Sequence, residues 1–184
     1  MSLFKNKYRI ESFRLPFYDY SVPGYYFITI CTKNRVFYFG NIMDGKLILS
    51  REGLIVKRNL QIFKKNFSNI DLDAFIVMPN HFHMILIIKK QISCGALINQ
   101  GSAQRKAYKL RIINNPMLLP VISLGYIMRL FKAKSSFLIR KKNKNFCWQT
   151  LYHEHIVRNE SELNRIREYI QNNPKNWIKD RNNI

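Results

Sequence analysis

The clearest pattern of apolar and polar residues lies in the segment 73–88. Its second half, 81–88, is rich in β-branched and aliphatic residues, and the turn signal Pro79-Asn80 precedes it. The pattern predicts a strand, in which successive side chains point to opposite faces of the sheet. One face then carries His81, His83, Ile85 and Ile87, and the other carries Phe82, Met84, Leu86 and Ile88.

Similar patterns predict three more strands, three helices and a hairpin. β-Branched and aromatic residues indicate strands over 25–32, 72–78 and 148–157. Apolar stripes of helical period indicate helices over about 51–67, over 124–142 and from about 160 to Asn172-Asn173-Pro174. Asp44-Gly45 marks a tight turn between two short strands within 41–49.

Each predicted helix has a capping residue before it and an apolar stripe along it. The caps are Ser50, Ser123 and either Asn159 or Ser161, whose side chains can accept a hydrogen bond from the first turn. The stripes expected to face the core are Leu54, Ile55, Ile62 and Phe63 in the first helix, Ile127, Leu130, Phe131 and Leu138 in the second, and Leu163, Ile166 and Ile170 in the last.

The order of these elements predicts an α+β fold. Strand, helix, strand, strand, helix, strand is the ferredoxin-like or RRM-like pattern, an antiparallel sheet with helices on one face. The hairpin is an insertion, and a further helix follows the last strand. In this topology the first and third strands are central, so the strand 81–88 should lie in the middle of the sheet. We expect one domain over 1–184, with a basic arm over 1–24 and a long loop over 91–120.

The charge of the chain narrows its function. It has 31 Lys and Arg against 11 Asp and Glu, a net charge of +20, which indicates a polyanionic partner such as nucleic acid or an anionic membrane. No apolar run approaches the ~20 residues of a membrane span, and residues 1–7 do not resemble a signal peptide. Three distant cysteines, Cys31, Cys94 and Cys147, fit free thiols and exclude a Cys-rich zinc site. We expect a cytoplasmic, nucleoid-associated protein without a membrane partner.

Basic residues gather on the predicted helix 124–142. Its charged positions share one sign, with no acidic residue among them, which favours a surface that faces phosphates. The candidate DNA-binding residues are Arg129, Lys132, Lys134, Arg140 and Lys141 on this helix, and Arg14 in the arm.

Two imidazoles on one face of a rigid strand can bind the same divalent ion. His81 and His83 would need a third ligand from elsewhere in the chain. In the last helix Tyr169 and Asn173 are four residues apart and therefore share a face. Near a metal that polarises a phosphodiester, a tyrosinate could attack phosphorus.

These segments together resemble a known family. Pro79-Asn80-His81-Phe82-His83, Tyr169-Ile-Gln-Asn-Asn-Pro174, the segment 152–159 and the segment 18–30 are similar to the single-tyrosine transposases of the HUH endonuclease superfamily. The similarity is greatest to the REP-associated tyrosine transposases, also called IS200-like. It covers nearly the whole chain except the loop 91–120.

The resemblance implies a metal-dependent endonuclease and strand transferase that cuts single-stranded DNA beside REP-like hairpins and rejoins it. Tyr169 would be the nucleophile that forms a 5′-phosphotyrosine, and His81, His83 and Asn173 would bind Mg²⁺ or Mn²⁺. Related transposases have Gln in place of Asn173, and Pro174 is expected to pull Asn173 out of helical geometry. The protein would be a monomer or a homodimer.

Two alternatives remain open at this point. All four histidines of the chain lie in His-x-His pairs, so His153 and His155 could join the first pair in a metallohydrolase. The resemblance instead implies that His155, with Glu154, lies beside the site and does not bind the metal. The second alternative is a non-catalytic RRM-like nucleic-acid-binding protein, which the charge and the aromatic residues would suit.

Overall fold

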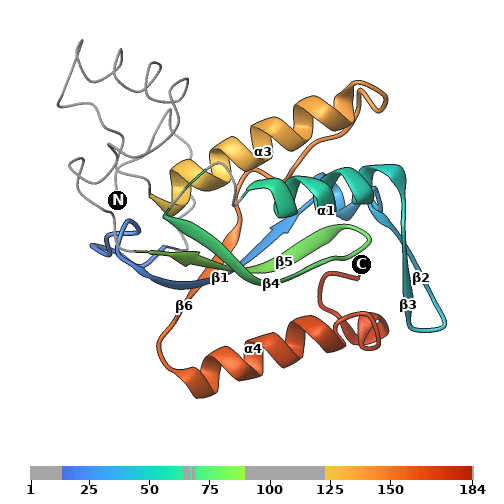
Figure 1. Ribbon diagram of the computed structural model, residues 1–184. Coiled ribbons are helices and arrows are strands. Elements are labelled where there is room, and N and C mark those ends of the chain that lie inside the picture. The colour runs from blue at the N-terminus through green and yellow to red at the C-terminus, as the bar shows by residue number, and fades with distance from the viewer. Residues whose placement is uncertain (1–13, 64–66, 68, 90–122, 184) are drawn as a thin grey trace, which may run out of the picture.

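The computed structural model describes residues 14–63, 67, 69–89 and 123–183. Most of the expected basic arm and the whole expected loop over 91–120 lie outside these residues. The described residues show an α+β fold built on one antiparallel sheet of four strands (Figure 1). None of the described helices is both long enough and apolar enough to cross a membrane.

The strands of this sheet lie in the order β4-β5-β1-β6. Their bounds are β1 Gly24–Cys31, β4 Ile70–Val77, β5 His81–Ile88 and β6 His153–Val157. The helices are α1 Arg51–Phe63, α3 Leu124–Arg140 and α4 Glu160–Asn172, and β2 Gly40–Met43 pairs with β3 Lys46–Leu49 in the separate hairpin. The first and third strands of the ferredoxin-like pattern are central, as predicted.

The alternation of side chains along β5 divides the molecule into two layers. Helices α1 and α3 cover one face of the sheet and α4 covers the other (Figure 1). Phe82, Met84, Leu86 and Ile88 belong to the large core on the side of α1 and α3. On the other side, Ile85 packs against Leu163, Ile166 and Ile170 of α4 in a second, smaller core. Both predicted faces of the strand are therefore confirmed.

The local signals for turns and caps are confirmed as well. Asp44 and Gly45 both have positive φ, 51° and 70°, as a two-residue hairpin turn requires. The Ser50 side chain accepts a hydrogen bond from the Gly53 amide, and Ser123 caps α3. Asn159, rather than Ser161, caps α4 by accepting from the Glu162 amide.

The predicted apolar stripe of α1 is wrong in part. Ile55 packs against the core as predicted, but Leu54 and Ile62 are exposed, and Val56 and Leu60 are buried in their place. A Cβ built on Gly53 would lie 2.1 Å from the carbonyl oxygen of Phe39, so the helix touches the backbone before β2 at this glycine. Because Gly53 has no side chain, the helix can approach the Phe39 carbonyl, and this contact sets the rotation of α1. The pattern of hydrophobic residues alone does not reveal the rotation.

The last strand is shorter than predicted. Trp148 forms only an isolated bridge with Thr32, and the ladder with β1 begins at His153. Between them, the carbonyl oxygens of Gln149 and Thr150 accept hydrogen bonds from the Lys132 amine, at 2.5 and 2.9 Å. These carbonyls point to α3 and cannot continue the ladder.

Gly53 provides a test of this packing. Gly53→Ala should lower the free energy of unfolding by about 1–3 kcal/mol, because the new methyl group clashes with backbone that cannot move aside. Gly125→Ala in α3 is the matched control, since its methyl group would meet only the flexible end of the Arg14 side chain at 3.0 Å. That variant should stay within about 1 kcal/mol of the wild type. Urea unfolding measures both, and equal stabilities would contradict the close contact.

Candidate active site

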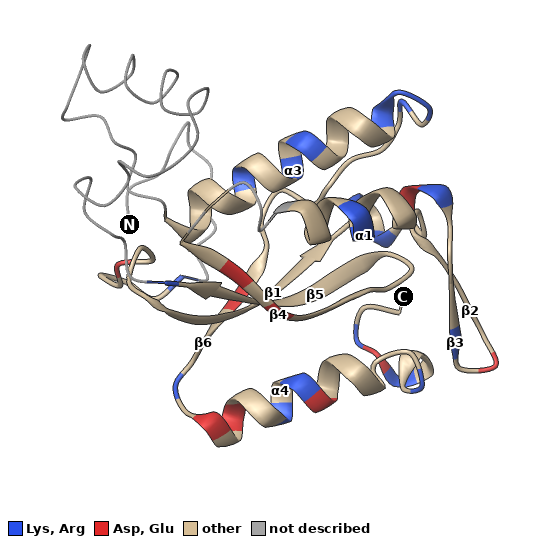
Figure 2. Ribbon diagram, in the orientation of Figure 1, with Lys and Arg blue, Asp and Glu red and all other residues tan. Residues whose placement is uncertain are grey.

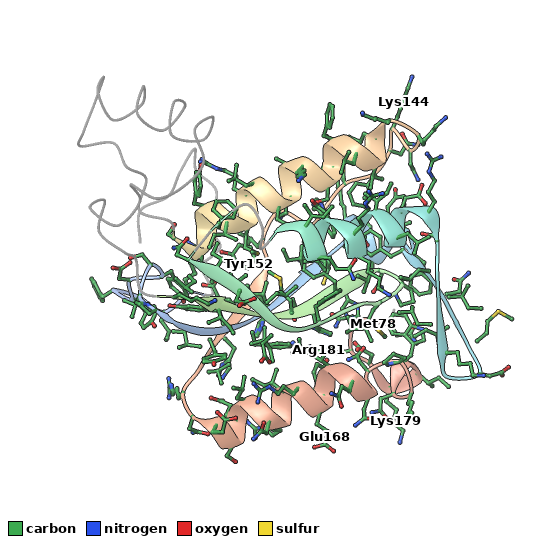
Figure 3. All side chains as sticks on the ribbon, in the orientation of Figure 1. Met78, Lys144, Tyr152, Glu168, Lys179 and Arg181 are labelled. Carbon is green, nitrogen blue, oxygen red and sulfur yellow. The ribbon has the colours of Figure 1, made fainter. Side chains whose placement is uncertain are left out.

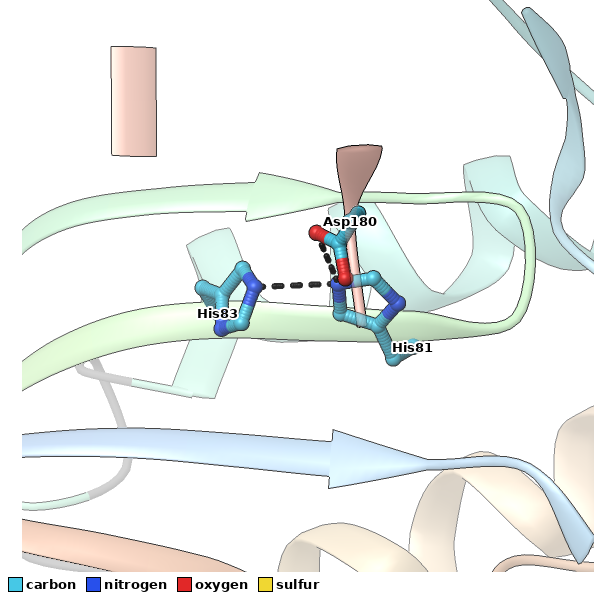
Figure 4. A group of neighbouring side chains, drawn as sticks. All are labelled: His81, His83 and Asp180. Atoms are coloured by element: carbon cyan, nitrogen blue, oxygen red, sulfur yellow. Dashed lines mark hydrogen bonds and ion pairs between the residues drawn. The ribbon is translucent and has the colours of Figure 1, made fainter. Parts of the chain in front are cut away.

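The site is built on the two histidines of β5. His81 and His83 point to the face covered by α4, and their Nε2 atoms are 2.9 Å apart (Figure 4). Both rings are buried. The antiparallel register places Cys31 of β1 opposite His81, and Thr29 opposite His83. The pair therefore lies in the middle of the sheet, on the central strand β5.

Hydrogen bonds orient both rings. The amide nitrogen of Asn80 donates to the carbonyl oxygens of Arg35 and Asn182, at 3.2 and 2.7 Å, so its Oδ1 is the acceptor for His81 Nδ1 at 2.8 Å. His81 therefore carries its proton on Nδ1 and presents a lone pair on Nε2. His83 Nδ1 lies 2.8 Å from the Thr29 hydroxyl. Holding the outer nitrogen in this way is typical of histidines that bind metals.

Both imidazoles are held in the neutral form. Burial lowers the pKa of His81 to about 3, with further lowering by Arg35 and Arg181. Burial also lowers the pKa of His83 well below its usual value, and the neighbouring His81 adds to the effect. A neutral imidazole is the form that binds a metal ion.

Asp180 completes a group that the sequence did not indicate. Ligand atoms of His81, His83 and Asp180 all lie within 4.8 Å of one another, and Asp180 Oδ2 is 3.9 Å from His81 Nε2 (Figure 4). The other carboxylate oxygen accepts a hydrogen bond from the Asn182 amide at 2.6 Å. Trp177, buried and stacked on His81 with ring centroids 5.9 Å apart, fixes this segment to the strand. The only sequence signal was an acidic residue within a basic C-terminal segment.

Tyr169 lies next to the pair. Its hydroxyl is 3.3 Å from His83 Nε2, and its ring makes edge contacts with His83 and Phe27. The side chain is 42% exposed, so one side of the phenol is open to a substrate. Helix α4 therefore brings the predicted nucleophile and the predicted metal ligands together.

Asn173 is buried one turn after Tyr169, and its Oδ1 has no hydrogen-bond partner among the described residues. The Asn173 side chain also donates to the Tyr169 hydroxyl, and an orphaned amide oxygen this close to the proposed nucleophile is a suitable further donor for a divalent cation. Its backbone remains helical, with φ −56° and ψ −42°. The expectation that Pro174 displaces it from helical geometry is therefore wrong, since Asn173 caps α4 in that geometry.

The phenol of Tyr169 is not activated by its surroundings alone. Burial raises its pKa, and Asp180 raises it further. A hydrogen bond from the Asn173 side chain and the charge of Arg181 lower it, but they do not outweigh the first two effects. A cation bound beside Asp180 would oppose the effect of the carboxylate and favour the tyrosinate.

The second histidine pair and its neighbours have other contacts. His155 Nε2 lies 2.8 Å from Glu162 at the start of α4. Glu154 points to the opposite side, where it pairs with Arg14 at 3.2 Å. Among the described residues, neither His153 nor His155 belongs to the group around His81. The geometry thus brings together one histidine pair with a carboxylate, and not four histidines.

The predicted basic residues do not converge on this site. Lysines and arginines line α3, on the far side of the sheet from α4 (Figure 2). Lys132 and Arg140 donate to carbonyl oxygens of the chain, those of Gln149 and Thr150 and that of Phe146. Arg14 contacts Glu154 and Tyr152. Arg129, Lys134, Arg140 and Lys141 are exposed, and Lys132 is half-buried.

Asp180→Asn tests the third ligand. The amide keeps the shape of the side chain and can still accept from the Asn182 amide, but it lacks the charge. Mn²⁺ affinity, measured by calorimetry, should fall at least about ten-fold, the loss typical even for residues that only orient a ligand. Asp44→Asn, in the exposed hairpin turn, is the control and should bind Mn²⁺ like the wild type. Equal affinities of the two variants would remove Asp180 from the site.

Comparisons with known proteins identify a relative in sequence and a solved structure of similar fold. An uncharacterized protein of Haemophilus influenzae is 37% identical over 171 residues, which cover 92% of this chain and 91% of that protein. A solved structure, the REP-associated tyrosine transposase bound to a REP hairpin, matches with a TM-score of 0.58 and 17% identity, over 91% of this chain and 74% of the other. No family model matches. The chain therefore belongs to the same family as the Haemophilus protein, and its fold is that of the IS200-like tyrosine transposases.

Proposed function

We propose that the protein is a metal-dependent endonuclease and strand transferase for single-stranded DNA, with Tyr169 as its nucleophile. One observation carries the proposal: the Tyr169 hydroxyl lies 3.3 Å from the Nε2 of a buried, oriented histidine pair. A tyrosine that served only for packing would not need two neutral imidazoles, a carboxylate and an orphaned amide oxygen around its hydroxyl. A nucleophile within contact distance of groups that could hold an activating cation is what metal-assisted covalent catalysis requires.

The reaction would transfer a phosphoryl group of the DNA from a 3′-oxygen to the Tyr169 oxygen. The Tyr169 hydroxyl gives up its proton and its oxygen bonds to phosphorus. The bond from phosphorus to the 3′-oxygen breaks, and that oxygen takes up a proton, so that in net the proton lost by the phenol appears on the leaving 3′-hydroxyl. The 5′-phosphotyrosine keeps the energy of the broken bond, so a second 3′-hydroxyl can reverse the step without a nucleotide cofactor. Mg²⁺ or Mn²⁺, held by His81, His83 and Asp180 with Asn173 as a further oxygen donor, would polarise the phosphate and favour the tyrosinate.

The proposed substrate is single-stranded DNA beside a REP-like hairpin. The net charge of +20 supports a nucleic-acid partner, and the solved structure of similar fold is bound to a REP hairpin. The protein would act in the cytoplasm at the nucleoid, as a monomer or a homodimer.

A purely RRM-like binding role fits the fold less well. RRM domains stack bases on the sheet face that their two helices leave open. Here α4 covers that face, and Phe27 of β1 contacts His83 and Tyr169 (Figure 1). The aromatic surface that such a protein needs is thus engaged within the proposed catalytic site.

Tyr169→Phe is the decisive experiment. The variant keeps the ring contacts with Phe27 and His83 and removes only the hydroxyl. It should fold and bind DNA and Mn²⁺ normally, but cleavage should fall at least about a thousand-fold, as expected for a lost nucleophile. In denaturing gels, the wild type with Mn²⁺ should form a covalent adduct that mass spectrometry maps to Tyr169 through a 5′-phosphate. An adduct on Tyr152, or cleavage by Tyr169→Phe at the wild-type rate, would refute the proposal.

DNA affinity should depend on the exposed lysines of the α3 side. Lys134→Ala with Lys141→Ala removes two exposed charges and leaves the contacts of Lys132 and Arg140 intact. If each lysine meets one phosphate, the slope of log affinity against log salt concentration should become shallower by about 1.4, or about 0.7 per contact with a single strand. Fluorescence anisotropy measures this slope. Lys46→Ala, on the separate hairpin, should leave it unchanged, and an unchanged slope in the double variant would exclude this surface.

A further inference from the structure

A pocket of about 290 Å³ lies beside the histidine pair. Its floor comes from Thr29 and Cys31 of β1, which lie opposite His83 and His81, and from His153 of β6, which pairs with Thr29 on the other side. Its walls include Leu151 and Tyr152 from the segment before β6 and residues of the C-terminal segment. This volume is close to that of a single nucleotide.

The lining of this pocket fits an anion that carries a flat ring. Arg35 and Arg181 bring two positive charges, and no carboxylate lines the pocket among the described residues. The Arg35 guanidinium donates to Cys31 Sγ at 3.0 Å and to the Asn182 side chain, so it is held in place. Arg181 is exposed and lies between the sheet and α4 (Figure 3). The apolar wall offers the exposed Leu151 side chain to a base, whereas the Tyr152 ring lies under Arg14 and packs against the core of the α1 and α3 side.

The pocket and the proposed nucleophile lie on different sides of the histidines. Tyr169 contacts Phe27 and His83, at the end of the site nearer the start of β1. The pocket begins at Thr29 and extends past Cys31, towards the other end of that strand. In phosphoryl transfer the attacking and leaving oxygens lie roughly in line across the phosphorus. A nucleophile at the Phe27 end therefore directs the leaving oxygen to the Cys31 end.

We propose that this pocket binds the nucleotide immediately 5′ of the scissile phosphate, the one that leaves with a free 3′-hydroxyl. The inference rests on the proposed function and adds to it a place for the leaving strand. Arg35 and Arg181 would bind the phosphate on the 5′ side of that nucleotide, while Leu151 contacts its base. Holding the 3′-hydroxyl next to the phosphotyrosine would also keep it ready for rejoining.

Photocrosslinking tests the position directly. Single-stranded DNA carrying 4-thiothymidine at one position at a time is bound to the Tyr169→Phe protein, which should leave the strand uncut. The position immediately 5′ of the cut should crosslink to the peptide containing Leu151–His153. The position immediately 3′ of the cut should not. Crosslinks from the 3′ position to this peptide, or none from any position, would overturn the proposal.

Photocrosslinking does not depend on cleavage, so it tests the nucleotide pocket separately from the proposed endonuclease activity. If the wild type does not cut but one nucleotide still crosslinks to the pocket, the proposed function fails, and so does the assignment to a leaving strand. If the wild type cuts and no nucleotide reaches the pocket, only the pocket proposal fails.

Filling the pocket provides a kinetic test. Leu151 is 45% exposed at its rim, and Leu151→Trp would occupy space meant for the base. An abasic site immediately 5′ of the cut should lower kcat/KM of the wild type about ten-fold, the scale of one lost base contact. With intact DNA, Leu151→Trp should lower kcat/KM by a similar factor. With abasic DNA, kcat/KM of this variant should fall no further, because the base contact is already lost.

Leu54→Trp is the control for added bulk, because Leu54 is 55% exposed on α1, across the sheet from the site. Leu54→Trp should cut intact DNA like the wild type, and an abasic site should lower its kcat/KM about ten-fold, as in the wild type. A full abasic penalty in Leu151→Trp as well would place the base elsewhere and refute the pocket.

Discussion

The side-chain amide of Asn80 is the interaction on which the rest of the site depends. Its nitrogen donates to the carbonyl oxygens of Arg35 and Asn182, and its oxygen accepts from His81. Three segments distant in the sequence, the turn before β5, the short helix after β1 and the C-terminal segment, thus meet at one buried group. Its backbone carbonyl also accepts from the amide and the hydroxyl of Thr32. Because these partners surround a fully buried amide, losing one would leave unpaired polar groups in the interior.

The hydrogen bonds of Asn80 explain how the Asp180 carboxylate comes to face the histidines. Asp180 belongs to no long helix or strand, and short contacts on both sides hold it. Trp177 stacks on His81 before it, and Asn182 binds Asn80 after it. The candidate metal-binding group therefore assembles only when the C-terminal segment docks, although the histidines themselves lie on a central strand of the sheet.

Much of the architecture could be predicted from the sequence, because it follows from local chemistry. Alternation in β5 assigns its faces, Asp44-Gly45 specifies the hairpin turn, and Asn159, one of two predicted candidates, caps α4. The strand order follows from the ferredoxin-like sequence of elements. The positions of His81, His83 and Tyr169 relative to one another follow from that topology together with the family resemblance.

The parts that could not be predicted depend on contacts between distant residues. The rotation of α1 is set by a glycine touching the carbonyl of Phe39, a contact that no periodicity reveals. Asp180 lies nearly 100 residues from the histidines, and no spacing rule connects them. The charged groups of Lys132 and Arg140 bind carbonyls of their own chain, whereas composition predicts only that they are basic.

The fixed tautomer of His81 determines the proton balance of ion binding. With its proton on Nδ1, His81 can only accept at Nε2, so in the absence of an ion the 2.9 Å contact requires His83 to donate from its own Nε2. A cation takes that place only if the proton of His83 moves to Nδ1, where the Thr29 hydroxyl can accept it. The change is one of tautomer and not of charge. At neutral pH these two rings would therefore take up a divalent ion without releasing a proton to solvent.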